Sequence, residues 1–280
     1  MAYQEEISRN NPALFLFLLD QSGSMKDAWG DYSSSKAQGA ADAVNRMLSN
    51  LVIRCSKGES VRDYFNISVI GYGSSEGHVG PALSGPLSGK DNVTISELAN
   101  SPARVEDRVI KQPDGAGGIV DASVKFPVWF EPTAQKDTPM CGALRYARRV
   151  VSEWVGQHPN SFPPIAINIT DGEATDGDPK EPAKDLRALG TSDGELLLFN
   201  CHISSLGGSK VFFPESVEQI PDEYGKRLFE MSSQLTPQMI AIAGKEGFAV
   251  GEHSRGFAFQ ADLVELVRFL DIGTRPKELR

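Results

Sequence analysis

Cysteine and histidine are scarce in this sequence, which has 3 cysteines and 4 histidines among its 280 residues. Cys55, Cys141 and Cys201 are odd in number and widely spaced, and each falls in a segment with the pattern of a helix or a strand. This usage argues against the dense disulfide framework of small secreted domains. We expect three buried thiols, as in a protein of a reducing compartment.

Basic residues are also fewer than acidic residues, 28 against 37. The formal net charge is −9 at pH 7, whereas proteins that bind nucleic acid or anionic membranes carry a basic surface. No apolar run approaches the roughly 18 residues that a membrane-spanning helix needs. Residues 1–12 contain Glu5, Glu6 and one arginine, Arg9, without the basic segment that opens a signal peptide. We therefore predict a cytoplasmic protein with no nucleic-acid or membrane partner.

Common enzyme motifs are absent as well. The sequence contains no G-x-S-x-G, no H-E-x-x-H and no Walker lysine loop. Gly71 and Gly73 do not begin a dinucleotide-binding fingerprint, because Glu76 occupies its sixth position. The sequence thus shows no recognisable catalytic motif.

What the chain does have is an unbroken apolar run, residues 13–19, that stops at Asp20. A short apolar run bounded by turn residues is typical of a strand buried on both faces in a parallel sheet. Ser22 and Ser24 follow, so one carboxylate and two hydroxyls lie on the loop that leaves this strand. Ligands that are all oxygen suit Mg²⁺ or Mn²⁺ rather than zinc. Asp and Ser also form ordinary turns, so a simple polar turn remains an alternative at this point.

Two further segments lie far down the chain. Residues 165–170 form a second apolar run, which also ends at an aspartate, Asp171, followed by Gly172. Between the two runs, Thr138 and Pro139 precede a strongly periodic helical pattern, and proline is favoured in the first turn of a helix. A strand end with an aspartate therefore occurs twice, with a helix start between the two.

In this order, the D-x-S-x-S loop, the T-P-M-x-x-A-L segment of residues 138–144 and the I-T-D-G segment of residues 169–172 resemble the von Willebrand factor A (VWA) domain family. The resemblance covers residues 13 to about 270. It implies an α/β fold with a doubly wound, mostly parallel six-stranded sheet (Rossmann-like) and helices on both faces. The implied strand order is 3-2-1-4-5-6, so the carboxyl ends of strands 1 and 4 meet at one crevice. We predict a single VWA domain over residues 1–280, with its core at about 13–272.

The resemblance also implies a metal-ion-dependent adhesion site (MIDAS). Its metal ligands are Asp20, Ser22, Ser24, Thr138 and Asp171. The hydroxyls bind Mg²⁺ or Mn²⁺ directly or nearly so, and the two aspartates bind directly or through water. Neutral hydroxyls leave the cation electrophilic, so a Glu or Asp of a partner protein completes its octahedron. Trp29 and Tyr32, on the loop after the serines, are placed to line the rim of the crevice.

The rest of the chain alternates between strand and helix patterns, as expected for parallel strands whose connections cross a face of the sheet. Helices are predicted at residues 36–54, 94–99, 138–157, 179 or 182 to 189, 221–232, 237–245 and 262–270. Further strands are predicted at residues 64–72, 79–83, 196–203 and 256–259 or 247–250.

The chain departs from a compact VWA plan within residues 74–132. Two strand patterns there, joined by D-G and G-G turn signals, predict a β-hairpin insertion at about residues 102–132. Phe126, Trp129 and Phe130 lie near its return, where the simplest interpretation is that they anchor the hairpin on the domain. The sequence does not indicate what the insertion does.

The leading hypothesis is a metal-dependent protein-interaction module and not an enzyme. Residues 22–25 and 169–176 look like those of bacterial intracellular VWA proteins linked to tellurium resistance and stress response, which are associated with kinase and phosphatase partners. The alternative is a Mg²⁺-dependent phosphohydrolase, since an aspartate at a strand end with Mg²⁺ also serves phosphoryl transfer. That alternative lacks a second carboxylate at position 22 and any evident lysine. A secreted adhesin is disfavoured by the missing signal peptide.

Overall fold

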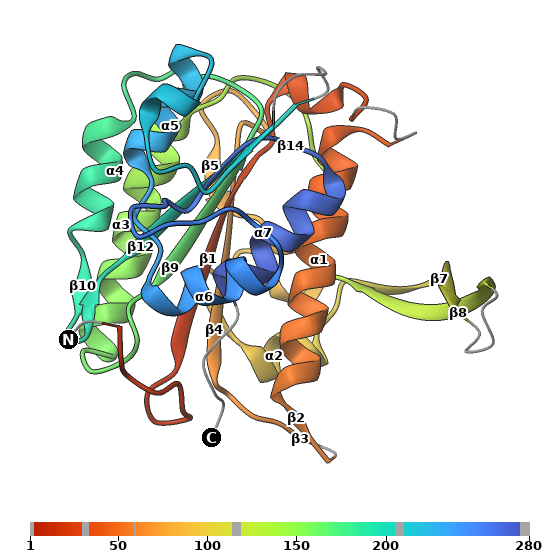
Figure 1. Ribbon diagram of the computed structural model, residues 1–280. Coiled ribbons are helices and arrows are strands. Elements are labelled where there is room, and N and C mark those ends of the chain that lie inside the picture. The colour runs from red at the N-terminus through yellow and green to blue at the C-terminus, as the bar shows by residue number, and fades with distance from the viewer. Residues whose placement is uncertain (1–2, 30–33, 59, 114–118, 205–209, 275–280) are drawn as a thin grey trace.

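A mostly parallel β-sheet runs through the centre of the computed structural model, which describes residues 3–29, 34–58, 60–113, 119–204 and 210–274 (Figure 1). The strands follow in this order across the sheet: β13 (Val211–Phe212), β14 (Phe257–Ala261), β12 (Leu197–Ile203), β9 (Ile165–Thr170), β1 (Ala13–Asp20), β4 (Phe65–Tyr72) and β5 (Val79–Pro81). A further strand, β6 (Val93–Thr94), also pairs with β4. The strands from β14 to β4 run parallel, whereas β5, β6 and β13 are antiparallel to their neighbours.

The predicted fold class and strand order are confirmed. Without the two-residue strands β6 and β13, the sheet has the order β5-β4-β1-β9-β12-β14, which is 3-2-1-4-5-6 in chain order. The sheet has 8 strands and not six, because β6 and β13 add pairings too short to leave a periodic sequence pattern. Strand β1 therefore lies between β4 and β9, where the strand order reverses.

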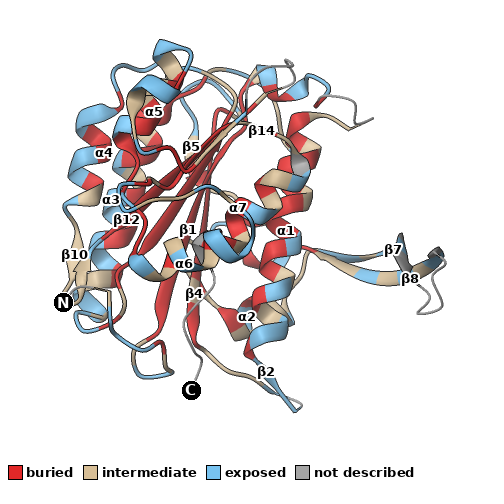
Figure 2. Cartoon of the chain, viewed as in Figure 1, coloured by how far each residue is buried: buried red, intermediate tan, exposed pale blue. Residues whose placement is uncertain are grey.

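Side chains of β1 alternate between two hydrophobic cores, one on each face of the sheet. Figure 2 shows the central strands as buried, with helices on either side of them. The core of the odd-numbered side chains is covered by α1 (Lys36–Cys55), α2 (Ile95–Asn100), α6 (Pro237–Lys245) and α7 (Leu263–Thr274). The core of the even-numbered side chains is covered by α3 (Met140–Gln157), α4 (Lys180–Arg187) and α5 (Glu223–Met231). Burial on both faces explains why the sequence of β1 is a continuous apolar run.

Helix α3 begins at Met140 and not at Thr138, which leaves Thr138 in the loop that precedes the helix. The first turn of α3 is bound by Asp176, from the loop after β9. Its carboxylate accepts hydrogen bonds from the backbone N–H groups of Cys141 and Gly142, at 3.0 and 2.7 Å. These bonds satisfy two of the donors that a helix start leaves open, and they tie the loop after β9 to the start of α3.

The predicted β-hairpin insertion is confirmed. Strands β7 (Arg104–Pro113) and β8 (Ile119–Val128) pair along their whole length as a separate antiparallel sheet. The hairpin projects away from the body of the molecule (Figure 1). Residues 114–118, which hold the D-G and G-G signals, lie outside the described residues.

Aromatic residues at the base anchor the hairpin on the domain. Trp129 and Phe130 are buried, and the Asn45 side chain accepts hydrogen bonds from their backbone N–H groups at 2.8 and 3.1 Å. Asn45 also donates to the carbonyl of Phe130 at 2.8 Å. Farther out, the guanidinium of Arg108 lies 3.7 Å from the centre of the Phe126 ring. The simple interpretation of Trp129 and Phe130 therefore holds.

Short elements complete the described fold. They are the strands β2 (Ser56–Lys57), β3 (Ser60–Val61), β10 (Gly190–Thr191) and β11 (Gly194–Glu195), and the 3₁₀ helices η1 (Gly23–Lys26), η2 (Gly85–Leu87) and η3 (Val217–Gln219). Cys55, Cys141 and Cys201 are buried free thiols, as expected. Among the described residues, no helix combines the length and the apolar character needed to cross a membrane.

Candidate metal centre

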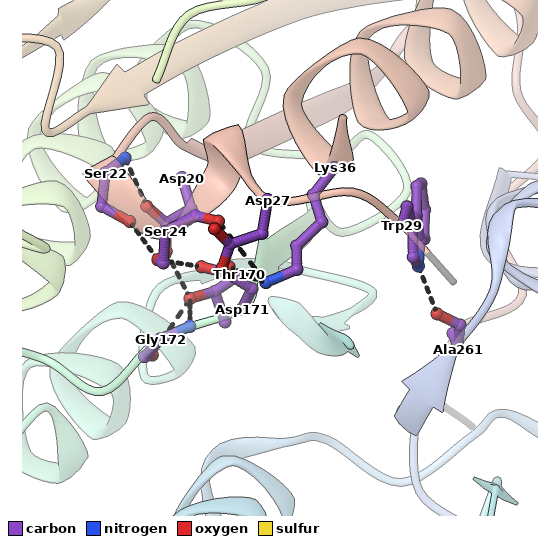
Figure 3. A network of polar contacts seen from close by, with 10 residues as sticks. All are labelled: Asp20, Ser22, Ser24, Asp27, Trp29, Lys36, Thr170, Asp171, Gly172 and Ala261. Atoms are coloured by element: carbon purple, nitrogen blue, oxygen red, sulfur yellow. Dashed lines mark hydrogen bonds and ion pairs between the residues drawn. The ribbon is translucent and has the colours of Figure 1, made fainter. Parts of the chain in front are cut away.

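The five predicted ligands come from three loops at one edge of the sheet. Strands β1 and β9 pair in parallel, so both end at this edge. Asp20 is the last residue of β1, and Asp171 directly follows β9. Ser22 precedes η1 and Ser24 lies within it, on the loop that leaves β1 (Figure 3). The topology thus brings residues from distant parts of the sequence to one place.

Hydrogen bonds join Asp20, both serines and Asp171 into one network (Figure 3). The backbone N–H of Ser22 donates to Asp20 Oδ1 at 2.8 Å. The hydroxyl oxygens of Ser22 and Ser24 are 3.2 Å apart. The hydroxyl of Ser24 then donates to Asp171 Oδ1 at 2.7 Å. The two aspartates are therefore connected through the serine loop.

Thr138 completes the set. Its backbone N–H donates to Thr175 Oγ1 at 3.0 Å, and its carbonyl accepts from the backbone N–H of Thr175 at 3.0 Å. A Cβ atom placed on Gly172 would lie 3.4 Å from Thr138 Oγ1. The same atom would lie 3.8 Å from Ser24 Oγ and 3.9 Å from Asp20 Oδ2. Oxygens from three loops therefore surround one point, which a residue other than glycine would fill.

This donor set fits a hard divalent cation. It offers carboxylate and hydroxyl oxygens and neither nitrogen nor sulfur, which suits Mg²⁺ or Mn²⁺. In the part of the chain that the structure describes, no three His, Cys, Asp or Glu side chains gather as metal ligands, and this centre combines two carboxylates with three hydroxyls. The geometry brings all five predicted residues together, and their role as ligands remains a prediction.

Asp20 is buried, with 3% of its surface exposed. Burial raises the pKa of Asp20 to about 6, although hydrogen bonds from Ser22 and Thr170 act in the opposite direction. The Thr170 hydroxyl is 2.6 Å from Asp20 Oδ2. A cation beside Asp20 would favour the charged form that burial disfavours.

Sequence reasoning missed Lys36, which belongs to this network. Its Nζ atom lies 2.7 Å from Asp171 Oδ2 and 3.5 Å from Asp27 Oδ2. The side chains of Lys36 and Asp171 are 7% and 1% exposed. One signal was available, because Lys36 opens helix α1, where the helix dipole disfavours a cation and no acidic residue is present. The position of Asp171 beside it is visible only in the fold.

The prediction that Trp29 lines the rim of the crevice is wrong. Trp29 is 1% exposed, and its indole N–H donates to the carbonyl of Ala261 at 3.2 Å (Figure 3). A Cβ atom on Gly39 of α1 would lie 2.3 Å from the indole ring, so the ring packs directly on the helix backbone. Trp29 therefore joins the loop to the core. Tyr32 lies outside the described residues.

A cavity of about 610 Å³ adjoins the network on the side of Lys36 and Asp171. His202 and Tyr224 line it, and their rings meet edge to face at 5.7 Å between centres. Among the described residues, the Tyr224 hydroxyl and Gln260 Oε1, which also line the cavity, are buried without a hydrogen-bond partner. A cavity therefore lies next to the candidate centre, and two polar atoms that line it lack hydrogen-bond partners among the described residues.

No family model and no curated protein matches this sequence. Solved structures do resemble its fold. A von Willebrand factor type A protein from Catenulispora acidiphila is 15% identical, with 95% of this chain and 42% of that chain covered and a TM-score of 0.47. The strand order of the sheet, with helices on both faces, agrees with the one that the resemblance to the VWA family implies. At this identity the likeness concerns the fold alone.

Two further structures are similar to the same extent. Proximal thread matrix protein 1 from the mussel byssus is 16% identical, with 94% of this chain and 47% of that chain covered and a TM-score of 0.48. The pilus adhesin SpaC from Lactobacillus rhamnosus GG is 12% identical, with 94% and 31% covered and a TM-score of 0.44. The chain thus spans less than half the length of each of these proteins.

Proposed function

We propose that this chain is a protein-interaction module of the VWA type, which binds an acidic group of a partner protein through a Mg²⁺ or Mn²⁺ ion held at a MIDAS. The observation that carries this proposal is the cradle at Gly172, where Thr138 Oγ1, Ser24 Oγ and Asp20 Oδ2 surround one point. A divalent cation there supplies an electrophilic position for an anionic ligand.

The hydroxyl and carboxylate residues have different roles in holding the cation. The hydroxyls of Ser22, Ser24 and Thr138 are neutral donors, and Asp20 and Asp171 supply the negative charge that retains the cation. A shell of this kind leaves a coordination position for a carboxylate oxygen of the partner, because oxygen-bound Mg²⁺ is usually octahedral and keeps exchangeable waters. Of the five proposed ligands, Asp171 also lines the neighbouring cavity.

Isothermal titration with MgCl₂ and MnCl₂ tests the proposal. We expect one ion to bind per chain, and we expect the Asp20→Ala/Asp171→Ala double variant to bind none while it stays folded by circular dichroism. A control double variant, Asp121→Ala/Asp185→Ala, removes the same charge at exposed positions and is expected to bind normally. Stoichiometric binding by the first double variant would place the ion elsewhere and overturn the proposal.

We propose further that the module works in the cytoplasm, in a bacterial stress-response or defence complex of the tellurium-resistance type that includes a kinase or a phosphatase. Residues 22–25 and 169–176 support this assignment, as do the three free buried cysteines. Co-purification from the source cell with and without chelator tests it, together with tellurite sensitivity of a deletion strain. Normal tellurite resistance and no chelator-sensitive partner would contradict this assignment without affecting the metal centre.

One observation favours the second candidate, a Mg²⁺-dependent phosphohydrolase. The lysine that the sequence did not reveal is present, as Lys36 lies 2.7 Å from Asp171 Oδ2. Position 22 is nevertheless a serine, and the Lys36 amine is already bound by carboxylates. Release of phosphate from p-nitrophenyl phosphate with Mg²⁺, lost in Asp20→Asn, would support the hydrolase. No turnover with stoichiometric Mg²⁺ binding would support the interaction module.

A further inference from the structure

Lys36 is an unusual residue for its position. It opens helix α1, where the partial positive charge of the helix N-terminus opposes a cation. Its side chain is 7% exposed, and lysine is rarely buried unless it is paired. The partner is Asp171, whose side chain is 1% exposed, at 2.7 Å. This ion pair therefore compensates a placement that neither helix formation nor burial favours.

The two oxygens of Asp171 have different partners (Figure 3). Oδ1 accepts the hydroxyl of Ser24, whose oxygen is one of the three around the cradle at Gly172. Oδ2 accepts the ammonium of Lys36. Lys36 thus holds Asp171 from its other oxygen, and the cradle oxygens stay available. Lys36 and a cation in the cradle oppose each other in charge.

Lys36 changes the net charge of the buried groups around a bound cation. Asp20 and Asp171 carry two negative charges, so a divalent cation would make the centre neutral if Lys36 were absent. With Lys36 present, the same cation leaves one positive charge on this group of residues. Asp27, also near Lys36, is 64% exposed, and water screens its charge. One monovalent anion restores neutrality.

We propose that Lys36 is a built-in counter-cation that makes binding of the metal and binding of the partner's carboxylate depend on each other. In the metal-free protein it neutralises Asp171, so that folding does not require the ion. In the loaded protein it leaves the charge that a carboxylate ligand neutralises. Lys36 thereby sets the requirement for an anionic partner. This inference rests on the proposed metal centre.

Titration of Mn²⁺ into the wild-type protein and into Lys36→Met tests the proposal. We expect Lys36→Met to bind Mn²⁺ at least about tenfold more tightly, because a positive charge close to the ion is removed. Lys36→Arg keeps the charge and is expected to bind like the wild type. Lys26→Met changes the net charge equally at an exposed lysine of the same loop and is expected to leave the affinity unchanged. Equal or weaker Mn²⁺ binding by folded Lys36→Met would overturn the proposal.

Acetate serves as the probe for the partner's carboxylate. In the wild-type protein we expect Mn²⁺ affinity to rise by about threefold or more when chloride is replaced by acetate at constant ionic strength, after correction for the Mn²⁺–acetate complex in solution. In Lys36→Met we expect this coupling to be clearly weaker, because only the direct contact between the carboxylate and the ion remains. The absence of coupling in the wild type would overturn the proposal even if Lys36→Met did not fold. If neither protein binds Mn²⁺, the metal centre itself is refuted, whereas equal binding by both refutes only the role of Lys36.

Discussion

The hydroxyl of Thr170 donates a 2.6 Å hydrogen bond to Asp20 Oδ2, and this bond joins the ends of the neighbouring strands β9 and β1. Thr170 is completely buried and Asp20 nearly so. The other oxygen of Asp20 accepts from the backbone N–H of Ser22. Both oxygens of this carboxylate therefore have donors before any metal binds.

Replacing Thr170 with valine keeps the shape of the side chain and removes this donor. We expect Thr170→Val to lower the free energy of unfolding by about 1–3 kcal/mol, the usual cost of leaving a buried polar group without its partner. Urea denaturation at pH 7 without metal measures the change. Thr170→Ser retains a hydroxyl and is the matched control. A valine variant as stable as the wild type would show that the bond contributes nothing.

Thr138 contributes one of the oxygens around the cradle, so its hydroxyl can be removed without altering charge. We expect Thr138→Val to weaken Mg²⁺ binding on the order of tenfold, because a ligand or a donor to a bound water is lost. Thr138→Ser keeps the oxygen and is expected to bind within a few fold of the wild type by calorimetry. Equal affinities in all three proteins would exclude Thr138 from the centre.

His202 is expected to make the free energy of unfolding depend on pH. Burial lowers the pKa of His202 to about 4, from an ordinary value of 6.5. As pH falls from about 6.5 to about 4, the unfolded chain takes up this proton before the folded chain does. We therefore expect His202 to remove up to about 3 kcal/mol of stability across this window, with no effect above it.

The measurement compares urea unfolding of the wild type with that of His202→Gln at several pH values. A difference is needed because the raised pKa of Asp20 acts in the opposite direction over part of the range. We expect the difference between the two proteins to shrink as pH falls. His253→Gln, at an exposed histidine, is the matched control. A constant difference between His202→Gln and the wild type would contradict the assignment.

Two deletions in the hairpin test which of its residues belong to the hydrophobic core of the domain. Arg104 pairs with Val128 at its base, so residues 105–127 can be replaced by a short glycine–serine turn. We expect this deletion to leave the thermal unfolding midpoint and Mg²⁺ binding nearly unchanged. A deletion that extends through Trp129 and Phe130 is expected to destabilise the protein strongly, because it removes two buried side chains and the partners of Asn45. Equal stability of the two deletions would refute the anchoring role.

The placement of the two aspartates could be predicted from two apolar runs in the sequence, together with the strand order that the resemblance to the VWA family implies. Each apolar run ends at an aspartate, and parallel neighbouring strands end at the same edge of a sheet. The strand order then brings Asp20 and Asp171 together. The hairpin was equally accessible, since its turn signals lie between two strand patterns.

The remainder depends on contacts between segments that share no local pattern. Trp29 looks like an exposed loop residue until the backbone of Gly39 is placed against its ring. From the sequence alone, Lys36 is expected at the solvated start of a helix. In the fold, the end of β9 places Asp171 beside its amine. Such pairings are set by tertiary packing, which propensity and periodicity do not encode.

Strand β1 is wedged between two hydrophobic cores, and Asp20 is its last residue. A strand locked in this way opens only when much of the domain unfolds, so its amides are expected to exchange with solvent among the slowest in the chain. The carboxylate proposed as the first oxygen ligand is thereby set at the end of a strand that is packed on both faces. An ion bound as proposed would meet a carboxylate that is already in place, and binding would cost little conformational entropy there. Adaptation to different partners would then fall to the loops around the centre.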